Sequence, residues 1–207
     1  DKPSPVIVCV PPDVTASVVE RELSAFAAAT VTDVASVKAE VLSELQAKGA
    51  DLERYVGSHP MAGRERGGAM SGRADLFVGR PWVISASDRS SAQDTAAVED
   101  LAIDLGSVPL RVSARDHDRA VALVSHVPQL VSSLLAARLV EAEAADVSLA
   151  GQGLRDTTRI AASDPKLWIQ ILAANAAEVA PILKSFEADL HSVDESLANL
   201  DQVASLA

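Results

Sequence analysis

The sequence has little cysteine and few aromatic residues, and each shortage excludes something. The chain of 207 residues has one cysteine, Cys9, so it cannot form an internal disulfide. Because Cys9 lies in an apolar run, we expect a buried thiol in a reducing compartment. Aromatic residues make up 3% of the chain and hydrophobic residues 48%, a composition typical of a soluble, helix-rich protein. The length allows one large domain or two small ones.

The chain also lacks an excess of positive charge and a long apolar run. Its formal charge of -11 argues against nucleic acid or an anionic membrane surface as a partner. A small anionic substrate remains possible, because a few arginines can reverse the field inside a cleft. The uninterrupted apolar runs are far shorter than a membrane span, and no charged-then-apolar leader opens the sequence. We therefore expect a soluble, cytoplasmic protein.

The first half of the chain alternates between strand and helix patterns. The run 6–10 is β-branched and apolar, which favours a strand buried on both faces of a parallel sheet. Asp13 is placed to cap a helix over 13–29, and Gly49 to end a helix over 37–48. Further strands are predicted over 30–32, 52–56, 81–85 and 108–112, and a helix over 92–105. This alternation indicates an α/β layer with parallel pairing.

The second half contains no good strand candidate. A helical pattern covers 120–144, where we expect Pro128 to kink or split the helix. Pro165 fits the first turn of another helix, capped by Ser163 or Asp164. From Val179 to Leu200 the apolar residues step by three and four, which predicts a long amphipathic helix whose seam packs within the subunit or against a second copy. We predict an α/β domain over 1–113 and a helical domain over 114–207.

A histidine stands between a predicted strand and a glycine-rich stretch. The segment Gly-Ser-His-Pro-Met-Ala-Gly-Arg-Glu over 57–65 predicts a loop that presents His59 to a cleft. A histidine there can accept a proton near neutral pH, although a lone loop histidine is more often structural or simply solvated. His117 and His191 are interpreted as surface or structural residues. We find no His, Cys and carboxylate set with metal-ligand spacing, so no metal is expected.

Several motifs around His59 follow one another in a recognisable order. Upstream is Val-Thr-Asp-Val-Ala-Ser-Val-Lys over 31–38, and downstream are His117-Asp118 and Ser-His-Val-Pro over 125–128. Arg-Asp-Thr-Thr-Arg-Ile-Ala-Ala-Ser-Asp-Pro follows over 155–165, and Leu167-Trp168 closes the series. In content and order these motifs resemble the prephenate/arogenate dehydrogenase family of tyrosine biosynthesis, from about residue 6 to about residue 175.

The resemblance implies an oxidoreductase that uses NAD or NADP and forms a homodimer through its helical domain. Its substrate would be prephenate or arogenate, which loses hydride from the hydroxyl-bearing carbon and then carbon dioxide. His59 matches the family base, and Ser36 matches the serine that orients the histidine and the hydroxyl. Ser36 can also be a helix N-cap. The carboxyl ends of parallel strands are where ligands bind in open α/β folds, which suits both residues.

The resemblance also assigns residues to the substrate. Arg159 matches the arginine that binds the ring carboxylate with two parallel bonds, and Arg155 lies on the same face if the stretch is helical. His126 and Gln129 would face the cleft. Where many relatives have a second histidine this chain has Gln129, which cannot become charged, so the choice between prephenate and arogenate stays open. Glu65 is placed to pair with an arginine and gate the site.

One part that the resemblance implies is missing from the sequence. No strand followed by Gly-x-Gly-x-x-Gly is present to hold a pyrophosphate, so the chain is similar to a dehydrogenase without the first half of its cofactor domain. The remaining cofactor-facing residues are expected after the first two strands, and they are Val10, Pro11, Pro12, Asp33 and Ser36. One alternative is a non-catalytic dimerisation or ligand-binding module. Another is a different dehydrogenase that pairs a Rossmann domain with a helical one, against which His117-Asp118 and Ser-Asp-Pro count.

Overall fold

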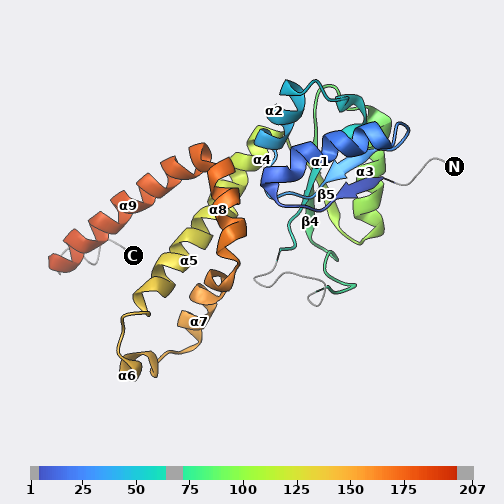
Figure 1. Ribbon diagram of the computed structural model, residues 1–207. Helices are drawn as coiled ribbons and strands as arrows, with labels where there is room; N and C mark the ends of the chain where they lie inside the picture. The colour runs from blue at the N-terminus through green and yellow to red at the C-terminus, as the bar shows by residue number, and fades with distance from the viewer. Residues whose placement is uncertain (1–4, 64–71, 200–207) are drawn as a thin grey trace.

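The computed structural model, which describes residues 5–63 and 72–199, has an α/β region followed by a helical region (Figure 1). The α/β region is built on one five-stranded sheet. Its strands, in spatial order, are β1 (Val6–Val8), β2 (Val31–Asp33), β3 (Tyr55–Pro60), β4 (Pro81–Ala86) and β5 (Val108–Arg111). The predicted fold class, a partial Rossmann-like sheet followed by helices, is confirmed.

The sheet is parallel except at one pair of strands. The pairs β1–β2, β2–β3 and β4–β5 are parallel, whereas β3 and β4 run antiparallel with Gly57 opposite Ser85. The expectation of parallel pairing throughout was wrong here. A parallel connection needs a crossover, usually a helix, and the described residues between β3 and β4 contain none.

Three helices pack against the sheet: α1 (Pro12–Ala25), α2 (Ala39–Ala47) and α3 (Ala92–Asp104). Pro12 occupies the first turn of α1, so Asp13 lies inside the helix and does not cap it as predicted, and the helix ends at Ala25, short of the predicted residue 29. Gly49 and Gly106 follow α2 and α3 with φ of 68° and 79°, so glycine ends both helices as predicted. One core lies around α1, α2, β1 and β2, and a second around β4 and α3, centred on Trp82 and Val98.

Strand β1 lies at the edge of the sheet and is open on one face. Ile7 is 40% exposed, and Cys9, just after the strand, is exposed as well. The predictions of a strand buried on both faces and of a buried thiol were therefore wrong. Among the described residues nothing pairs with the outer edge of β1 or covers this face.

From residue 114 onward, the regular elements that the structure describes are all helical, joined by turns and short irregular segments. The elements are α4 (Ala114–Val121), a π-helical turn (Ala122–His126), α5 (Val127–Arg138), α6 (Ala144–Val147), α7 (Gln152–Thr158), a 3-10 turn (Arg159–Ala162), α8 (Pro165–Ala174) and α9 (Ala176–Ala198). Figure 1 shows α9 and the α5–α7 pair leaving the region of α4 and α8 as two arms that point away from the sheet. As predicted, Asp164 caps α8, accepting the Lys166 N–H at 2.9 Å.

Pro128 does not split its helix. A continuous helix runs from Ala114 to Arg138, and the π-helical turn just before Pro128 absorbs the missing N–H donor. By length and composition this is the one described helix that could cross a membrane, although no uninterrupted run in it is long. That is weak evidence for a membrane span, because the core helices of soluble proteins meet the same criteria.

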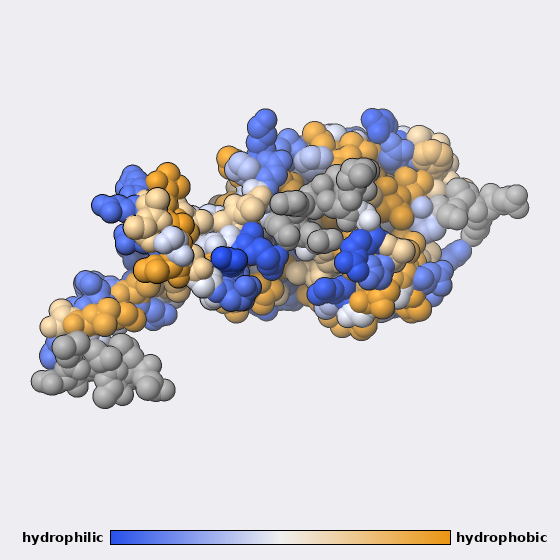
Figure 2. All heavy atoms as spheres, turned by 90° about the horizontal axis from the view of Figure 1, so that it is seen from below, coloured by the Kyte–Doolittle hydropathy of each residue, from blue (hydrophilic) through white to orange (hydrophobic). Residues whose placement is uncertain are grey.

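The amphipathic seam of α9 is buried at its start and exposed at its end. Val179 is 5% exposed and joins a small core with Ala122 and Val127. Further along, Leu190 and Leu197 are 54% and 58% exposed. The narrow helical arm in Figure 2 carries hydrophobic residues between hydrophilic ones on its surface. Packing within the subunit therefore accounts for only the first part of the seam.

Candidate active site

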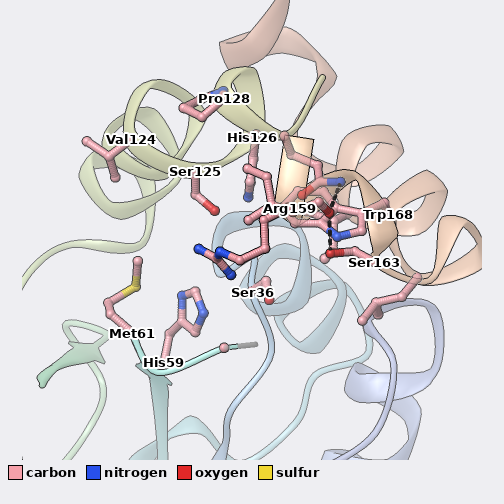
Figure 3. A pocket seen from close by; sticks show the side chains of 15 residues that line it. Ser36, His59, Met61, Val124, Ser125, His126, Pro128, Arg159, Ser163 and Trp168 are labelled. Atoms are coloured by element: carbon pink, nitrogen blue, oxygen red, sulfur yellow. Dashed lines mark hydrogen bonds between the residues drawn. The ribbon is translucent and has the colours of Figure 1, made fainter. Parts of the chain in front are cut away.

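A cavity of about 380 Å³ lies between the carboxyl ends of β2 and β3 and the helical region (Figure 3). It is lined by Ser36 and His59 from the α/β region and by polar residues from three helical segments. The complete lining is Ser36, His59, Met61, Gly63, Val124, Ser125, His126, Pro128, Gln129, Arg159, Ile160, Ser163, Leu167, Trp168 and Ile171. The cavity therefore joins the two halves of the chain.

His59 is the first residue of a hydrogen-bonded relay. It lies in strand β3 itself, so the prediction that a loop presents it was wrong. Its Nδ1 is 2.8 Å from Nε2 of His117, and Nδ1 of His117 is 2.7 Å from a carboxylate oxygen of Asp118. Because a carboxylate only accepts, His117 donates to Asp118 from Nδ1, and its Nε2 then accepts from Nδ1 of His59. Neutral His59 consequently carries a lone pair on Nε2.

The surroundings of His59 keep it neutral. Burial lowers its pKa well below the ordinary histidine value, and the neighbouring His117, Lys38 and His126 lower it further. A neutral imidazole with a free lone pair can accept a proton from a bound molecule. In Figure 3 the ring stands at the floor of the cavity, opposite the guanidinium of Arg159.

Asp118 fastens the relay to the α/β region. Its two carboxylate oxygens accept the backbone N–H groups of Lys38 and Ala39 at 2.9 and 2.8 Å, at the start of α2. A carboxylate is favoured there, since the first N–H groups of a helix have no partner within it. Asp118 is 2% exposed, so one buried side chain on α4 holds both His117 and the first turn of α2.

His126 is held at the end of the π-helical turn as a neutral hydrogen-bond donor. The side-chain amide of Asn175 donates to Nδ1 of His126 at 3.0 Å and to the backbone oxygen of Asp118 at 2.8 Å. The hydrogen of neutral His126 therefore sits on Nε2. Burial lowers the pKa of His126 to about 4. Its ring meets Trp168 edge to face at 5.8 Å, which fixes the ring against the cavity wall.

Arg159 reaches into the cavity from a short turn that helix α5 holds in place. The amide of Gln129 donates to the backbone oxygen of Ile160 at 3.0 Å, and Ser132 donates to that of Thr157 at 2.7 Å. Figure 3 shows the guanidinium extending toward His59. A planar cation there can hold a carboxylate a fixed distance from the base.

The structure gathers most, but not all, of the residues predicted for the site. Ser36, His59, His126, Gln129 and Arg159 line one cavity. Arg155 does not line it and is exposed on α7, whereas Arg159 is the first residue of the 3-10 turn that follows this helix. Glu65 lies outside the described residues.

The residues predicted to face a cofactor differ in how far their side chains are exposed. Val10 and Pro12 are half-buried and Pro11 is exposed, all at the carboxyl end of β1. The side chain of Asp33 is fully buried, and Lys38, Tyr55 and the Ala35 N–H bind its carboxylate. A side-chain contact between Asp33 and a cofactor is therefore excluded in this arrangement.

Sequence reasoning missed two residues of the relay. His117, interpreted as a surface or structural residue, is 1% exposed and bonded to His59, so the surface alternative was wrong. A His-Asp pair at the start of an otherwise apolar helix was the available signal. His191, in contrast, is exposed on α9. Among the residues that the structure describes, no group of three or more His, Cys, Asp or Glu is arranged to hold a metal ion.

Two family models match consecutive parts of the chain. Residues 2–110 match the nucleotide-binding domain of prephenate dehydrogenase, and residues 113–206 match its dimerisation domain. Together these matches include every residue of the cavity.

Curated relatives and solved structures lead to the same family. A probable prephenate dehydrogenase, NovF, from Streptomyces niveus is 38% identical over 92% of this chain and 53% of its own length. Cyclohexadienyl dehydrogenase from Zymomonas mobilis is 33% identical over 83% of this chain and 59% of its own length. The chain thus spans little more than half of these relatives.

Prephenate dehydrogenase from A. aeolicus, solved with hydroxyphenyl propionate and NAD+, superposes with a TM-score of 0.85. It is 27% identical, and the match covers 98% of this chain and 72% of that one. From these matches, the chain belongs to the prephenate dehydrogenase family.

Proposed function

We propose that this chain carries the substrate site of an enzyme that oxidatively decarboxylates prephenate or arogenate with NAD or NADP. The observation that supports this most strongly is the cavity in which neutral His59, backed by His117 and Asp118, faces Arg159. That pairing suits a carboxylate substrate whose hydroxyl must lose a proton.

The relay can take up the proton and give it back. Nε2 of His59 accepts the hydroxyl proton as hydride leaves the same carbon, and the hydroxyl becomes a carbonyl. The bond to the ring carboxylate then breaks, carbon dioxide departs, and the electron pair makes the ring aromatic. The carbonyl oxygen recovers a proton from His59 to become a phenol. Asp118 favours the transient positive charge on the two imidazoles.

Arg159 would anchor the ring carboxylate, and the opposite wall would contact the side chain of the substrate. That wall offers His126 as a neutral donor and Gln129, whose amide nitrogen donates to Ile160 and Ser133. Neither residue is charged at neutral pH, so neither selects strongly between a keto acid and an amino acid. Ser36, half-buried beside His59, would orient the hydroxyl.

The carboxyl ends of β1 and β2 would hold the nicotinamide part of the cofactor, which accepts hydride when bound. Val10, Pro11, Pro12 and Ser36 lie at that edge with accessible surface, the position where open α/β sheets bind ligands. Asp33, which is 0% exposed, lies behind this edge. The pyrophosphate-binding glycine motif is absent from the 207 residues, so we expect weak cofactor affinity from this polypeptide.

We further propose two domains, 1–113 for the cofactor and 114–207 for substrate binding and dimerisation, in a cytoplasmic homodimer. The exposed apolar residues of the helical arms support dimerisation. An apolar groove of about 470 Å³ between α5, α7 and α9, which includes Val131, Leu135 and Phe186, offers a surface for a second copy.

The test measures the formation of NADH or NADPH. Prephenate and arogenate are each assayed with NAD and, separately, with NADP. The chain is assayed alone and after addition of the glycine-rich half of the Streptomyces relative's cofactor domain. We expect turnover in the extended protein, and His59→Asn should lower it by roughly 10²–10⁴-fold. His191→Asn, which changes an exposed histidine, is the matched control and should leave it unchanged.

A non-catalytic binding module is the alternative, since the chain spans only about half of its relatives. Substrate binding measured by calorimetry separates the two. Turnover that depends on His59 supports the enzyme. Binding that weakens in Arg159→Lys, without turnover in the extended protein, would favour the module. No binding and no turnover would contradict both.

A further inference from the structure

A buried lysine lies directly behind the candidate site. Lys38 is 1% exposed, although lysine is almost never fully buried unless it is paired. Its ammonium pairs with the carboxylate of Asp33, which is 0% exposed. The mechanism above uses neither side chain, and neither lines the cavity. A buried ion pair costs desolvation energy, so it is poor evidence for a gain in stability alone.

The pair closes the segment that carries Ser36. Lys38 reaches back five residues to Asp33, which also accepts the Ala35 N–H at 2.8 Å. The second oxygen of Asp33 accepts the hydroxyl of Tyr55 from the neighbouring strand at 2.7 Å. The loop between β2 and α2 is therefore tied at both ends and to β3, the strand on which His59 lies.

The same lysine borders the histidine relay. Its backbone N–H donates to Asp118 at 2.9 Å, and its side chain passes close to Gly57, two residues before His59. If Gly57 carried a β-carbon, that atom would lie 3.5 Å from Cδ of Lys38. Lys38 thus contacts the loop of Ser36, the strand of His59 and the carboxylate that ends the relay.

The charges of these buried groups explain what the pair achieves. Asp33 is paired with Lys38, whereas Asp118 accepts a hydrogen bond from His117, which is bonded in turn to His59. Asp118 therefore favours a proton that arrives at the relay, while the charge of Asp33 is offset by Lys38. Without Lys38, a second bare carboxylate would favour protonation of His59 before any substrate binds.

We propose that Lys38 is a positioning residue, which fixes the Ser36 loop against β3 and keeps His59 unprotonated. That these two residues act on substrate rests on the proposed function. The positioning itself can be measured without turnover, so failure of one does not imply failure of the other.

The first measurement is the NMR titration of the imidazole of His59 in the full chain, assigned by its loss in His59→Gln. Several groups face this ring: His117 with Asp118 behind it on α4, His126 on the π-helical turn, Arg159 on the 3-10 turn, and Lys38. Lys38→Met, of similar length but uncharged, should move the His59 titration to higher pH.

Lys48→Met is the matched control. Lys48 follows the same helix α2 and pairs with Glu20 at 2.9 Å, but it is exposed. It should leave the His59 titration unchanged. An unchanged titration in folded Lys38→Met would overturn the proposal.

The double variant Asp33→Asn, Lys38→Met covers the case in which the single variant does not fold, because it leaves no unpaired buried charge. Hydrogen exchange is then measured at the amides of residues 35 and 38. We expect exchange faster than in the natural sequence by about tenfold or more, with the amides around residue 48 unchanged. Equal protection at residues 35 and 38 would show that the pair does not hold the loop.

Discussion

The α/β region and the helical region use their interiors in opposite ways. In the α/β region the buried residues are mainly apolar and form two clusters on the sheet. In the helical region, as far as the structure describes it, buried polar residues outnumber buried apolar ones. The polar set is His117, Asp118, His126, Gln129, Ser132, Asn175 and Ser196.

This difference follows from where the candidate site lies. The first three of those buried polar residues form the relay and the cavity wall, and Gln129, Ser132 and Asn175 hold them or Arg159 in place. Large apolar residues of the same region, such as Leu134, Leu149 and Leu190, are exposed instead. The interior of the helical region thus contains mainly polar residues of the site, and large apolar residues lie on its surface, whereas the interior of the α/β region is mainly apolar.

The junction between the regions should be the most sensitive point. Asp118→Ala would remove the acceptor for two backbone N–H groups of α2 and for His117 at once. We expect a loss of about 3–5 kcal/mol of unfolding free energy in urea titration, as for other broken buried charge networks.

Asp116→Ala is the control for this variant. Asp116 lies two residues earlier on α4, half exposed, and pairs with Arg119. Its loss should cost about 1 kcal/mol or less. Equal effects of the two substitutions would mean that Asp118 does not join the regions.

A matched pair of leucines tests the contrast in packing. Leu45 in α2 is 0% exposed, and Leu197 in α9 is 58% exposed. We expect Leu45→Ala to lower the free energy of unfolding by about 2–5 kcal/mol and Leu197→Ala to lower it by about 0.5 kcal/mol or less. Both are measured at protein concentrations low enough to keep the chain monomeric. A large loss from Leu197→Ala would indicate packing within the subunit.

The exposed seam should respond to charge through association rather than folding. Leu190→Asp places a carboxylate on the outer part of α9, where a second copy would bury it. We expect the dimer dissociation constant to rise by roughly 10–100-fold, about 1.4–2.7 kcal/mol, in sedimentation equilibrium. Asp189→Asn, the neighbouring substitution that removes a charge instead, should not weaken the dimer. Unchanged association in Leu190→Asp would place the interface elsewhere.

The sequence predicted the fold where local chemistry decides it. The sequence indicated the glycines that end α2 and α3 and the Asp164 cap of α8, because each of these signals acts within a few residues. The antiparallel β4 and the open face of β1 were not, because strand direction and coverage depend on segments far apart in the chain. Pro128 was expected to kink or split its helix, since a π-helical turn leaves no mark in a hydrophobic pattern.

For the candidate site, too, local motifs were predictable and contacts between distant segments were not. The motif resemblance identified His59, Ser36, Arg159, His126 and Gln129, which the structure brings to one cavity. The groups that support them were missed because they act through contacts between distant segments. Lys38 and Asp118 are 80 residues apart, and His126 and Asn175 are 49 apart. Their burial could not be read from composition, since a His-Asp pair or a lone lysine is usually on the surface.

The smallest predicted effect concerns pH and again separates the regions. His126 has an ordinary pKa of 6.5 when unfolded and about 4 in the fold, because burial favours the neutral ring. Between these pH values the unfolded chain binds more protons than the folded chain, so acid lowers the free energy of unfolding. The stability that His126 contributes is complete above about pH 6.5 and is lost as the pH falls toward 4.

From pH 7 to pH 5 this histidine alone should cost about 1–2 kcal/mol of unfolding free energy. Carboxylates and His59 titrate over the same range. The contribution of His126 is therefore the loss of unfolding free energy in the unchanged chain minus the loss in His126→Gln. Glutamine keeps a hydrogen-bonding side chain but takes up no proton, so the variant should lose less stability over this range. An exposed histidine gives the control, and His191→Gln should follow the unchanged chain. If His126→Gln follows it too, then His126 is not held neutral by burial, and the helical region does not enclose its polar residues as tightly as the structure indicates.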